Sequence, residues 1–269
     1  MTASGYAPPD QTSAAAAMTA GQRARFERDG YLLVPGVLSP AEVGHYASVL
    51  DRVYRRHAAA GRLAADGSLH RLSAAASAPE LADLVAHPKA FGLVWSVLGW
   101  NIHVYHSHLD VHPPVRMARP FRFEWHQDGG RQNRELESDP RPRLSVKLAF
   151  WLSDVSRPGR GNFQVVPGSH LTNRIDGPPR RDVRWPDPPG AVQVCAAPGD
   201  AVFFDRRIWH ARSDNRSALT RPPPRAPPAS IMTLCPAHGG TDRANAAIWR
   251  AECHDRRGPR VDGPPPRGT

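Results

Sequence analysis

Hydrophobic positions recur at helical spacing in the first third of the chain and as short strand-like runs in the rest. Val43, Tyr46, Leu50 and Val53 mark one face of a helix. The segment Ser39-Pro40-Ala41-Glu42 in front of them is an N-terminal capping box with proline at the first helical position. The pattern therefore predicts a well-defined helix that begins at residue 40.

The remaining elements follow from the same patterns and from turn residues between them. We expect helices over 19–29 and 79–98, and loops over 59–77, 115–142 and 172–190. Strands are expected over 31–34, 101–111, 144–152, 162–166, 192–195 and 201–204. Short strands with regular turn signals after a helical third predict a mainly β fold with supporting α. The expected architecture is a double-sheet jelly roll, the double-stranded β-helix of cupin-like proteins, with N-terminal helices.

Composition narrows the functional classes. The 269 residues carry a net charge of +10, but the arginines are scattered, and no basic and aromatic interleaving indicates nucleic-acid binding. Three cysteines without a CxxC pair argue against a disulfide framework or a zinc ribbon. The sequence has no apolar run of membrane-spanning length. Residues 1–18 lack the features of a signal peptide, so we expect a disordered leader and a cytoplasmic protein.

The C-terminal segment differs from the rest of the chain. Residues 221–269 contain 10 prolines and 8 arginines, and only 231–234 and 244–249 have the pattern of folded elements. We therefore expect one domain over 19–221. It is followed by an atypical segment over 222–269 that is partly disordered or the product of a shifted reading frame.

Two short segments carry the candidate chemistry. In Trp125-His126-Gln127-Asp128, the imidazole and the carboxylate are two residues apart, so in an extended strand they point to the same face. His210, in Trp209-His210, follows a second strand-like run. Two histidines and one carboxylate are the ligand set of non-haem Fe(II) oxygenases. The pattern predicts a metal site formed by His126, Asp128 and His210.

Further motifs strengthen this interpretation. They are Arg25-Phe-Glu-Arg-Asp-Gly-Tyr, Tyr105-His-Ser-His-Leu, Phe150-Trp-Leu-Ser-Asp, Gly161-Asn162, Val166-Pro-Gly-Ser-His170 and Pro198-Gly-Asp. With the two metal segments, they make residues 19–221 similar to the phytanoyl-CoA dioxygenase family. The resemblance implies a double-stranded β-helix, Fe(II) as the metal, 2-oxoglutarate as cosubstrate, and O2.

The resemblance also implies how the cosubstrate is held. In this family an arginine about eleven residues beyond the distal histidine pairs with the distal carboxylate of 2-oxoglutarate, because the guanidinium fork fits a carboxylate. Arg221 has this spacing, and Asn215 and Ser217 fit the intervening pattern. Three prolines follow Arg221, so Arg225 is a rival. Lys147, inside an apolar strand, either lines the barrel near the cosubstrate or faces outward.

The implied activity is hydroxylation of an unactivated C–H bond in a small organic substrate, with release of succinate and CO2. Asp128 favours this over halogenation, because related halogenases have a small residue in place of the carboxylate. The alternatives are a cupin-like metal enzyme that does not use 2-oxoglutarate and an inactive barrel that binds a ligand. No nucleic-acid or membrane partner is expected, and the sequence does not indicate the oligomeric state.

Further histidines and arginines could have structural or functional roles. A second candidate metal group consists of His103, His106, His108 and His112. We expect instead that these histidines lie on a strand surface, where His106 or His108 lines the pocket. We expect His170 to be structural. Several arginines within 115–142 either meet an anionic substrate or form a solvated loop; these are Arg116, Arg119, Arg122, Arg131 and Arg134.

Overall fold

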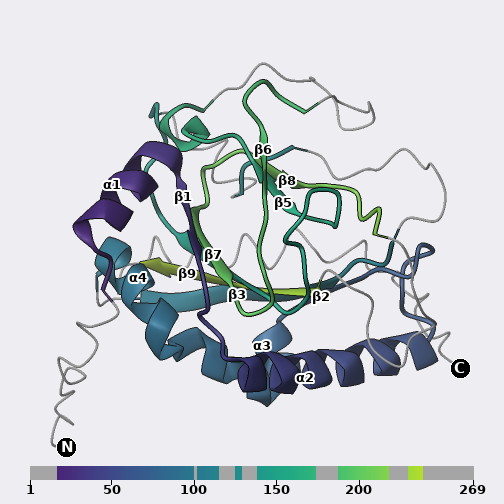
Figure 1. Cartoon of the computed structure of the whole chain (residues 1–269). Helices are drawn as coiled ribbons and strands as arrows, with labels where there is room; N and C mark the ends of the chain where they lie inside the picture. Colours follow the sequence, from purple (N-terminus) through teal and green to yellow (C-terminus); the bar gives the residue numbers. More distant parts are fainter. Residues whose placement is uncertain are drawn as a thin grey trace, which may run out of the picture. The chain divides into compact units, whose positions relative to one another are not determined.

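The computed structural model describes residues 17–99, 102–114, 125–128, 138–173, 187–217 and 230–238 (Figure 1). The helical elements are α1 (Ala20–Asp29), α2 (Pro40–Ala59), α3 (Ala74–Ser77), the 3₁₀ helices η2 (Pro79–Ala86) and η3 (Ser169–Leu171), and α4 (Pro88–Leu98). The strands are β1 (Tyr31–Val34), β2 (Leu69–Leu72), β3 (Ile102–Val111), β4 (Val146–Trp151), β5 (Phe163–Val165), β6 (Val192–Val194), β7 (Ala201–Asp205), β8 (His210–Arg212) and β9 (Ser230–His238).

The strands form two antiparallel sheets. The larger sheet has the order β1-β7-β4-β9-β3-β2, and the smaller sheet has the order β6-β5-β8. Val146 of β4 pairs with Asp205 of β7, and Val165 of β5 pairs with His210 of β8. Two sheets with these non-sequential neighbours confirm the jelly roll.

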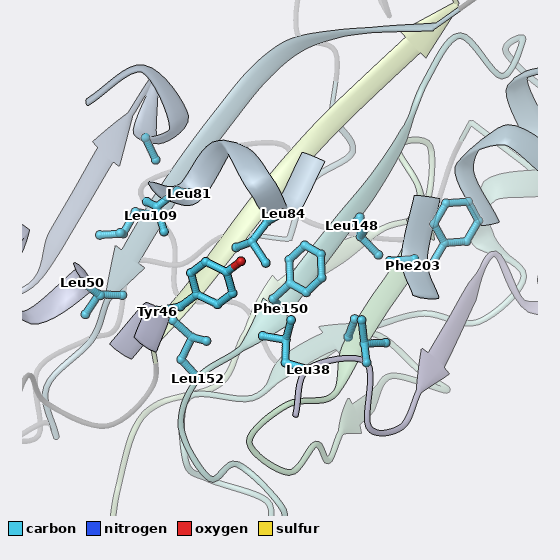
Figure 2. Close-up of a cluster of buried hydrophobic side chains, with 14 of the residues drawn as sticks. Leu38, Tyr46, Leu50, Leu81, Leu84, Leu109, Leu148, Phe150, Leu152 and Phe203 are labelled. Atoms are coloured by element: carbon cyan, nitrogen blue, oxygen red, sulfur yellow. The ribbon is translucent and has the colours of Figure 1, made fainter. Parts of the chain in front are cut away.

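Strand alternation gives the larger sheet two different faces. Leu148 and Phe150 of β4 pack with the helices, whereas Ala149 and Trp151 pack with residues of the smaller sheet. Figure 2 shows the helix-side core, in which Leu50, Leu81, Leu84, Leu109, Leu148, Phe150 and Phe203 gather. The face between the sheets therefore carries a second apolar cluster, and by strand alternation Lys147 of β4 lies on this face too.

The first two helices form as expected. Thr19 caps α1 with a reciprocal bond to Gln22, and Gly30 ends it in the left-handed conformation. Ser39 and Glu42 make the predicted capping box of α2. The helix predicted over 79–98 is wrong in one respect: it is broken at His87 into η2 and α4. Pro88 explains the break, because it lacks a backbone N–H and disfavours helical conformation in the residue before it.

The loop predicted over 59–77 is also only partly correct. It contains β2, which pairs with β3, and the short helix α3. Within the described ranges, no single helix has the length and apolar composition needed to cross a membrane; only η2 and α4, counted together as a bent pair, reach that limit.

The C-terminal segment contributes more than its composition indicated. Strand β9 lies inside the larger sheet, paired with β3 on one side and β4 on the other. The chain divides by its contacts into Met1–His238 and Gly239–Thr269, so the first unit extends beyond the expected boundary at residue 221. The predicted leader falls almost entirely outside the described residues, as does everything beyond His238.

Candidate active site

The two histidines predicted as metal ligands are joined by their backbones. The amide of His126 donates to the carbonyl of His210 at 3.0 Å, and the amide of His210 donates back at 2.9 Å. This antiparallel bridge sets the two imidazole rings side by side, with centroids 4.3 Å apart. Residues 84 positions apart thus meet because this bridge joins His126 to the first residue of β8.

Asp128 completes the cluster. Its Oδ1 lies 3.9 Å from His126 Nε2, and its Oδ2 lies 3.5 Å from His210 Nε2. All three ligand atoms lie within 4.8 Å of one another. These separations exceed a hydrogen bond and leave room for an ion among the three groups. The structure therefore brings together the three residues that the sequence predicted.

The protonation state of His210 suits metal binding. Its Nδ1 lies 2.9 Å from the carbonyl of Ile208, which makes Nδ1 the protonated nitrogen and leaves the Nε2 lone pair facing Asp128. Burial, together with the charge of His126, lowers the pKa of His210 to about 3. The imidazole is therefore neutral near pH 7, as a metal ligand must be.

Asp128 is a mostly buried carboxylate beside the ammonium of Lys147 and the imidazoles of His126 and His210. Burial by itself raises its pKa, but Lys147, His210 and His126 outweigh this effect and hold the pKa well below the usual range. The ammonium of Lys147 lies 2.7 Å from Oδ2. Lys147 thus faces the space between the sheets and not solvent, which decides between the two alternatives for its direction. An ionised carboxylate beside a neutral imidazole is a donor set that fits a divalent ion.

A buried ionic network supports the turn that leads into His210. Asp205 is fully buried and accepts bonds from Arg143 Nε at 2.6 Å and from Arg207 Nη2 at 2.7 Å. Burial raises the pKa of Asp205, but the bonds from Arg207 and Arg143 lower it overall. The carbonyl of Arg206, the next residue, accepts from the amide of Asp128 at 3.0 Å. The network therefore fixes the backbone that positions both Asp128 and His210.

Only some of the residues proposed to bind the cosubstrate lie in the part of the chain that the structure describes. Ser217 donates from Oγ to Asn215 Oδ1 at 2.6 Å, and Asn215 Nδ2 donates to the carbonyl of His112 at 2.8 Å. Arg221 and Arg225 lie outside the described residues, as do the arginines of 115–124 and 129–137. The roles of these residues in binding 2-oxoglutarate remain predictions.

A second group of histidines meets a carboxylate on β3. His108 Nδ1 lies 2.7 Å from Asp110 Oδ2, and His70 Nδ1 lies 2.5 Å from Asp110 Oδ1. Their ligand atoms also fall within 4.8 Å of one another, but these separations are hydrogen bonds that satisfy both oxygens of Asp110. Sequence analysis missed His70 and Asp110, although His70 pairs directly with Asp110 across β2 and β3.

His170 has the structural position that we expected. It is buried, and its Nε2 bonds to the carbonyl of Glu27 at 3.1 Å. A Cβ on Gly30 would lie 2.5 Å from its ring, so the glycine admits the imidazole.

Known proteins agree with this architecture. An ectoine dioxygenase of Nocardia farcinica is 26% identical over 235 residues, which cover 74% of each chain. The structure of EctD from S. alaskensis with 2-oxoglutarate and 5-hydroxyectoine has a TM-score of 0.59 at 20% identity, over 89% of this chain and 84% of that one. The epimerase SnoN, in complex with Fe3+, alpha ketoglutarate and nogalamycin RO, has a TM-score of 0.55 at 21% identity, over 86% and 84%.

The solved structures are too distant in sequence to show more than the fold. The decisive match is the family model for phytanoyl-CoA dioxygenase, which covers residues 26–222 and includes both segments of the candidate metal site. This chain therefore belongs to the phytanoyl-CoA dioxygenase (PhyH) family of Fe(II)- and 2-oxoglutarate-dependent oxygenases.

Proposed function

We propose that this protein hydroxylates an unactivated C–H bond of a small organic substrate, and that His126, Asp128 and His210 hold its Fe(II). As a member of its family the chain is a 2-oxoglutarate-dependent dioxygenase that uses Fe(II) and O2. The observation that carries the proposal is the cluster itself: three ligand atoms within 4.8 Å, on a backbone bridge. The bound metal, with 2-oxoglutarate and O2, supplies oxidative decarboxylation to succinate and CO2 and the oxidant that attacks the substrate.

The residues of this chain prepare that chemistry. His210 presents a neutral nitrogen because Ile208 holds the proton on its other nitrogen. The rings of Phe163 and Phe204 lie 5.4 Å from the ring of His210 and exclude water from that side. Asp128 supplies the single negative charge of the ligand set, which favours hydroxylation over halogenation. These residues thus give the site a set of metal donors and an apolar wall, both of which suit an oxygen-dependent reaction.

The cosubstrate has four proposed contacts. Lys147 is buried beside Asp128, within reach of an anion bound to the same metal. Ser217, Arg221 and Arg225 are proposed from the family resemblance, with one of the two arginines pairing with the distal carboxylate. Ectoine is the substrate named for the curated relatives, but 26% identity supports only the broader class of small organic substrates. A cytoplasmic location is part of the same proposal.

Two measurements test the proposal. Anaerobic addition of Fe(II) and 2-oxoglutarate should quench tryptophan fluorescence, because Trp125 and Trp209 flank the metal ligands. Succinate release over a panel of metabolites that includes ectoine should then identify a substrate, and mass spectrometry should show a product heavier by one oxygen atom.

Variants separate the metal site from general effects. His126→Ala and Asp128→Asn should abolish both the quenching and the succinate release, whereas His45→Ala, at an exposed histidine of α2, should change neither. A folded chain that binds Fe(II) but shows no affinity for 2-oxoglutarate would refute the cosubstrate assignment. A product without added oxygen would refute hydroxylation.

A further inference from the structure

Two neighbouring arginines in the turn between β7 and β8 have opposite surroundings. Arg206 and Arg207 are both buried, with 2% and 8% of their surfaces exposed. Arg207 donates from Nε and Nη2 to Asp205 at 2.9 and 2.7 Å, and from Nη1 to the carbonyl of Arg141 at 2.6 Å. Within the described part of the chain, Nε and Nη2 of Arg206 are buried and have no hydrogen-bond partner. In the part of the chain that the structure describes, Arg207 therefore has partners for its guanidinium, whereas two nitrogens of Arg206 have none.

Arg206 lies beside the metal site. Its carbonyl accepts the amide of Asp128 at 3.0 Å. Burial lowers the pKa of Arg206, and Tyr105, Asp205 and Asp128 are the neighbours that act in the opposite direction. Two of these are carboxylates that already have partners: Asp205 pairs with Arg207, and Asp128 pairs with Lys147. Arg206 is therefore an additional buried positive charge at the edge of the site.

The strands show at which end of the barrel this charge lies. Asp205, next to Arg206, ends β7 and pairs with Val146, the first residue of β4. The hydroxyl of Tyr105, near the start of β3, lies 3.3 Å from the hydroxyl of Ser145. Arg206, Tyr105 and Ser145 therefore share the end of the sheets where β3 and β4 begin. The amide of Asp128 bonds to the turn at this same end, so a molecule held there would adjoin the metal ligands.

A buried guanidinium without a partner opposes folding, because it has lost its hydration and gained no hydrogen bonds in return. An anionic ligand would remove that cost, and the planar fork of arginine fits the oxygens of a carboxylate or a phosphate. 2-Oxoglutarate is one anion that enters the site, but Lys147 and an arginine after Ser217 are already proposed for it. The substrate is a second ligand that can bring negative charge to this site.

We propose that Arg206, with the hydroxyls of Tyr105 and Ser145 beside it, binds an anionic group of the substrate. The substrates are then small molecules that carry a carboxylate or a phosphate at one end and present a C–H bond to the metal. This inference rests on the proposed function, because it names the substrate class for the same site.

The test measures anion binding by titration calorimetry. The probes are benzoate, its uncharged analogue benzamide, and inorganic phosphate, each added to the full chain loaded anaerobically with Fe(II) and saturating 2-oxoglutarate. The wild-type chain should bind benzoate or phosphate more tightly than benzamide. Arg206→Gln should weaken that binding about 10- to 100-fold, the range for hydrogen bonds to a charged group. Arg206→Lys should retain part of it, and Arg157→Gln, at an exposed turn, should change nothing.

Two further readouts exclude a structural role. Arg206→Gln should keep the melting temperature of the wild-type chain or raise it, because the substitution removes an unpaired buried charge. The affinity for 2-oxoglutarate should also stay the same. A lower melting temperature with unchanged anion affinity would overturn the proposal, and so would a wild-type chain that prefers benzamide. A loss of 2-oxoglutarate affinity alone would assign Arg206 to the cosubstrate and would also overturn it.

Failure of the proposed function can be recognised separately. If the chain binds neither Fe(II) nor 2-oxoglutarate, the same titrations are carried out on the metal-free chain. Anion binding that depends on Arg206 would then support the anion subsite and overturn the oxygenase assignment. Absence of such binding would overturn both.

Discussion

Lys147 should stabilise the metal-free chain more than the metal-bound chain, because it contacts Asp128. The substitution Lys147→Met tests this expectation. In the metal-free chain the ammonium lies 2.7 Å from Oδ2 and neutralises a buried carboxylate. A bound metal ion would neutralise the same carboxylate. The variant should therefore be much less stable than the wild-type chain without metal, and closer to it with metal.

The magnitude follows from burial. Lys147 is 8% exposed, and the side chain of Asp128 is 17% exposed, so solvent screens the pair weakly. Removal of one partner of a buried ion pair costs about 3–5 kcal/mol. Methionine keeps most of the side-chain volume, so little of this loss comes from a cavity. Because metal binding relieves the penalty, metal affinity should rise in the variant by about 100-fold for 3 kcal/mol of relief.

Urea unfolding with and without Mn(II), a redox-stable substitute for Fe(II), measures both effects. The metal-induced increase in the free energy of unfolding should be larger in Lys147→Met than in the wild-type chain. Lys89→Met is the matched control, since Lys89 is exposed on α4 and its ammonium donates to the backbone carbonyl of Gly36 at 3.2 Å. A metal-free Lys147→Met chain as stable as the wild type would refute the argument, as would an unchanged metal-induced increase.

Two other substitutions test the support of the site. Asp205→Asn should lower the free energy of unfolding, measured in urea, by about 3–5 kcal/mol, because this fully buried carboxylate pairs with two arginines. The control Asp154→Asn removes one partner of a half-exposed ion pair and should lower it by less than about 1 kcal/mol. The pKa of Asp205 is lowered in the folded state, so its contribution should be present above about pH 4 and lost as the pH falls further, which acid titration of wild type against Asp205→Asn would show. Gly199→Ala should lower the free energy of unfolding by about 1–3 kcal/mol, because φ is +97° and a Cβ would lie 2.6 Å from the Leu38 carbonyl oxygen. Gly61→Ala, with positive φ but open surroundings, should lower it less. Equal melting temperatures of the two variants would contradict the reasoning.

Local signals in the sequence predicted the N-terminal elements well. The capping residues Thr19 and Ser39 act within a few residues of their partners, so their outcome depends little on the rest of the fold. The break at Pro88 is also indicated by the sequence, although apolar positions at helical spacing continue on both sides of it. A proline in the middle of a predicted helix should have ended it.

Strand β9 could be predicted only in part, over 231–234, because the stability of the whole strand comes from its neighbours. Its surroundings in the sequence are rich in proline and arginine, and Pro236 argues against a central strand. In the sheet, Pro236 pairs with Val104 next to the bulge at 104–106, where the ladder is already irregular. Pairing with β3 and β4 on both sides therefore overrides the local preference, and no window of sequence contains that information.

The cluster of His126, Asp128 and His210 was predictable because its residue types and spacing are specific, and the structure adds how the three residues meet. The sequence could not show that His126 and His210 are bridged, or that Lys147 contacts Asp128. The sequence did not indicate a role for Arg206, because two adjacent arginines are not unusual in a chain that is rich in arginine. Among the described residues, Arg207 has hydrogen-bond partners that the buried Nε and Nη2 of Arg206 lack, and this difference sets the two arginines apart.

The turn from Asp205 to His210 links stability to function through this difference. Asp205 binds Arg207 and Arg143, and this network holds the turn in one conformation. The same turn carries the carbonyl that binds the Asp128 amide and ends at His210. Since the network already stabilises the turn, the cost of burying Arg206 without a partner can be tolerated there. If Arg206 had a structural role, Asp205→Asn and Arg206→Gln would both lower the stability of the chain. If Arg206 binds substrate, Asp205→Asn lowers the stability and Arg206→Gln does not.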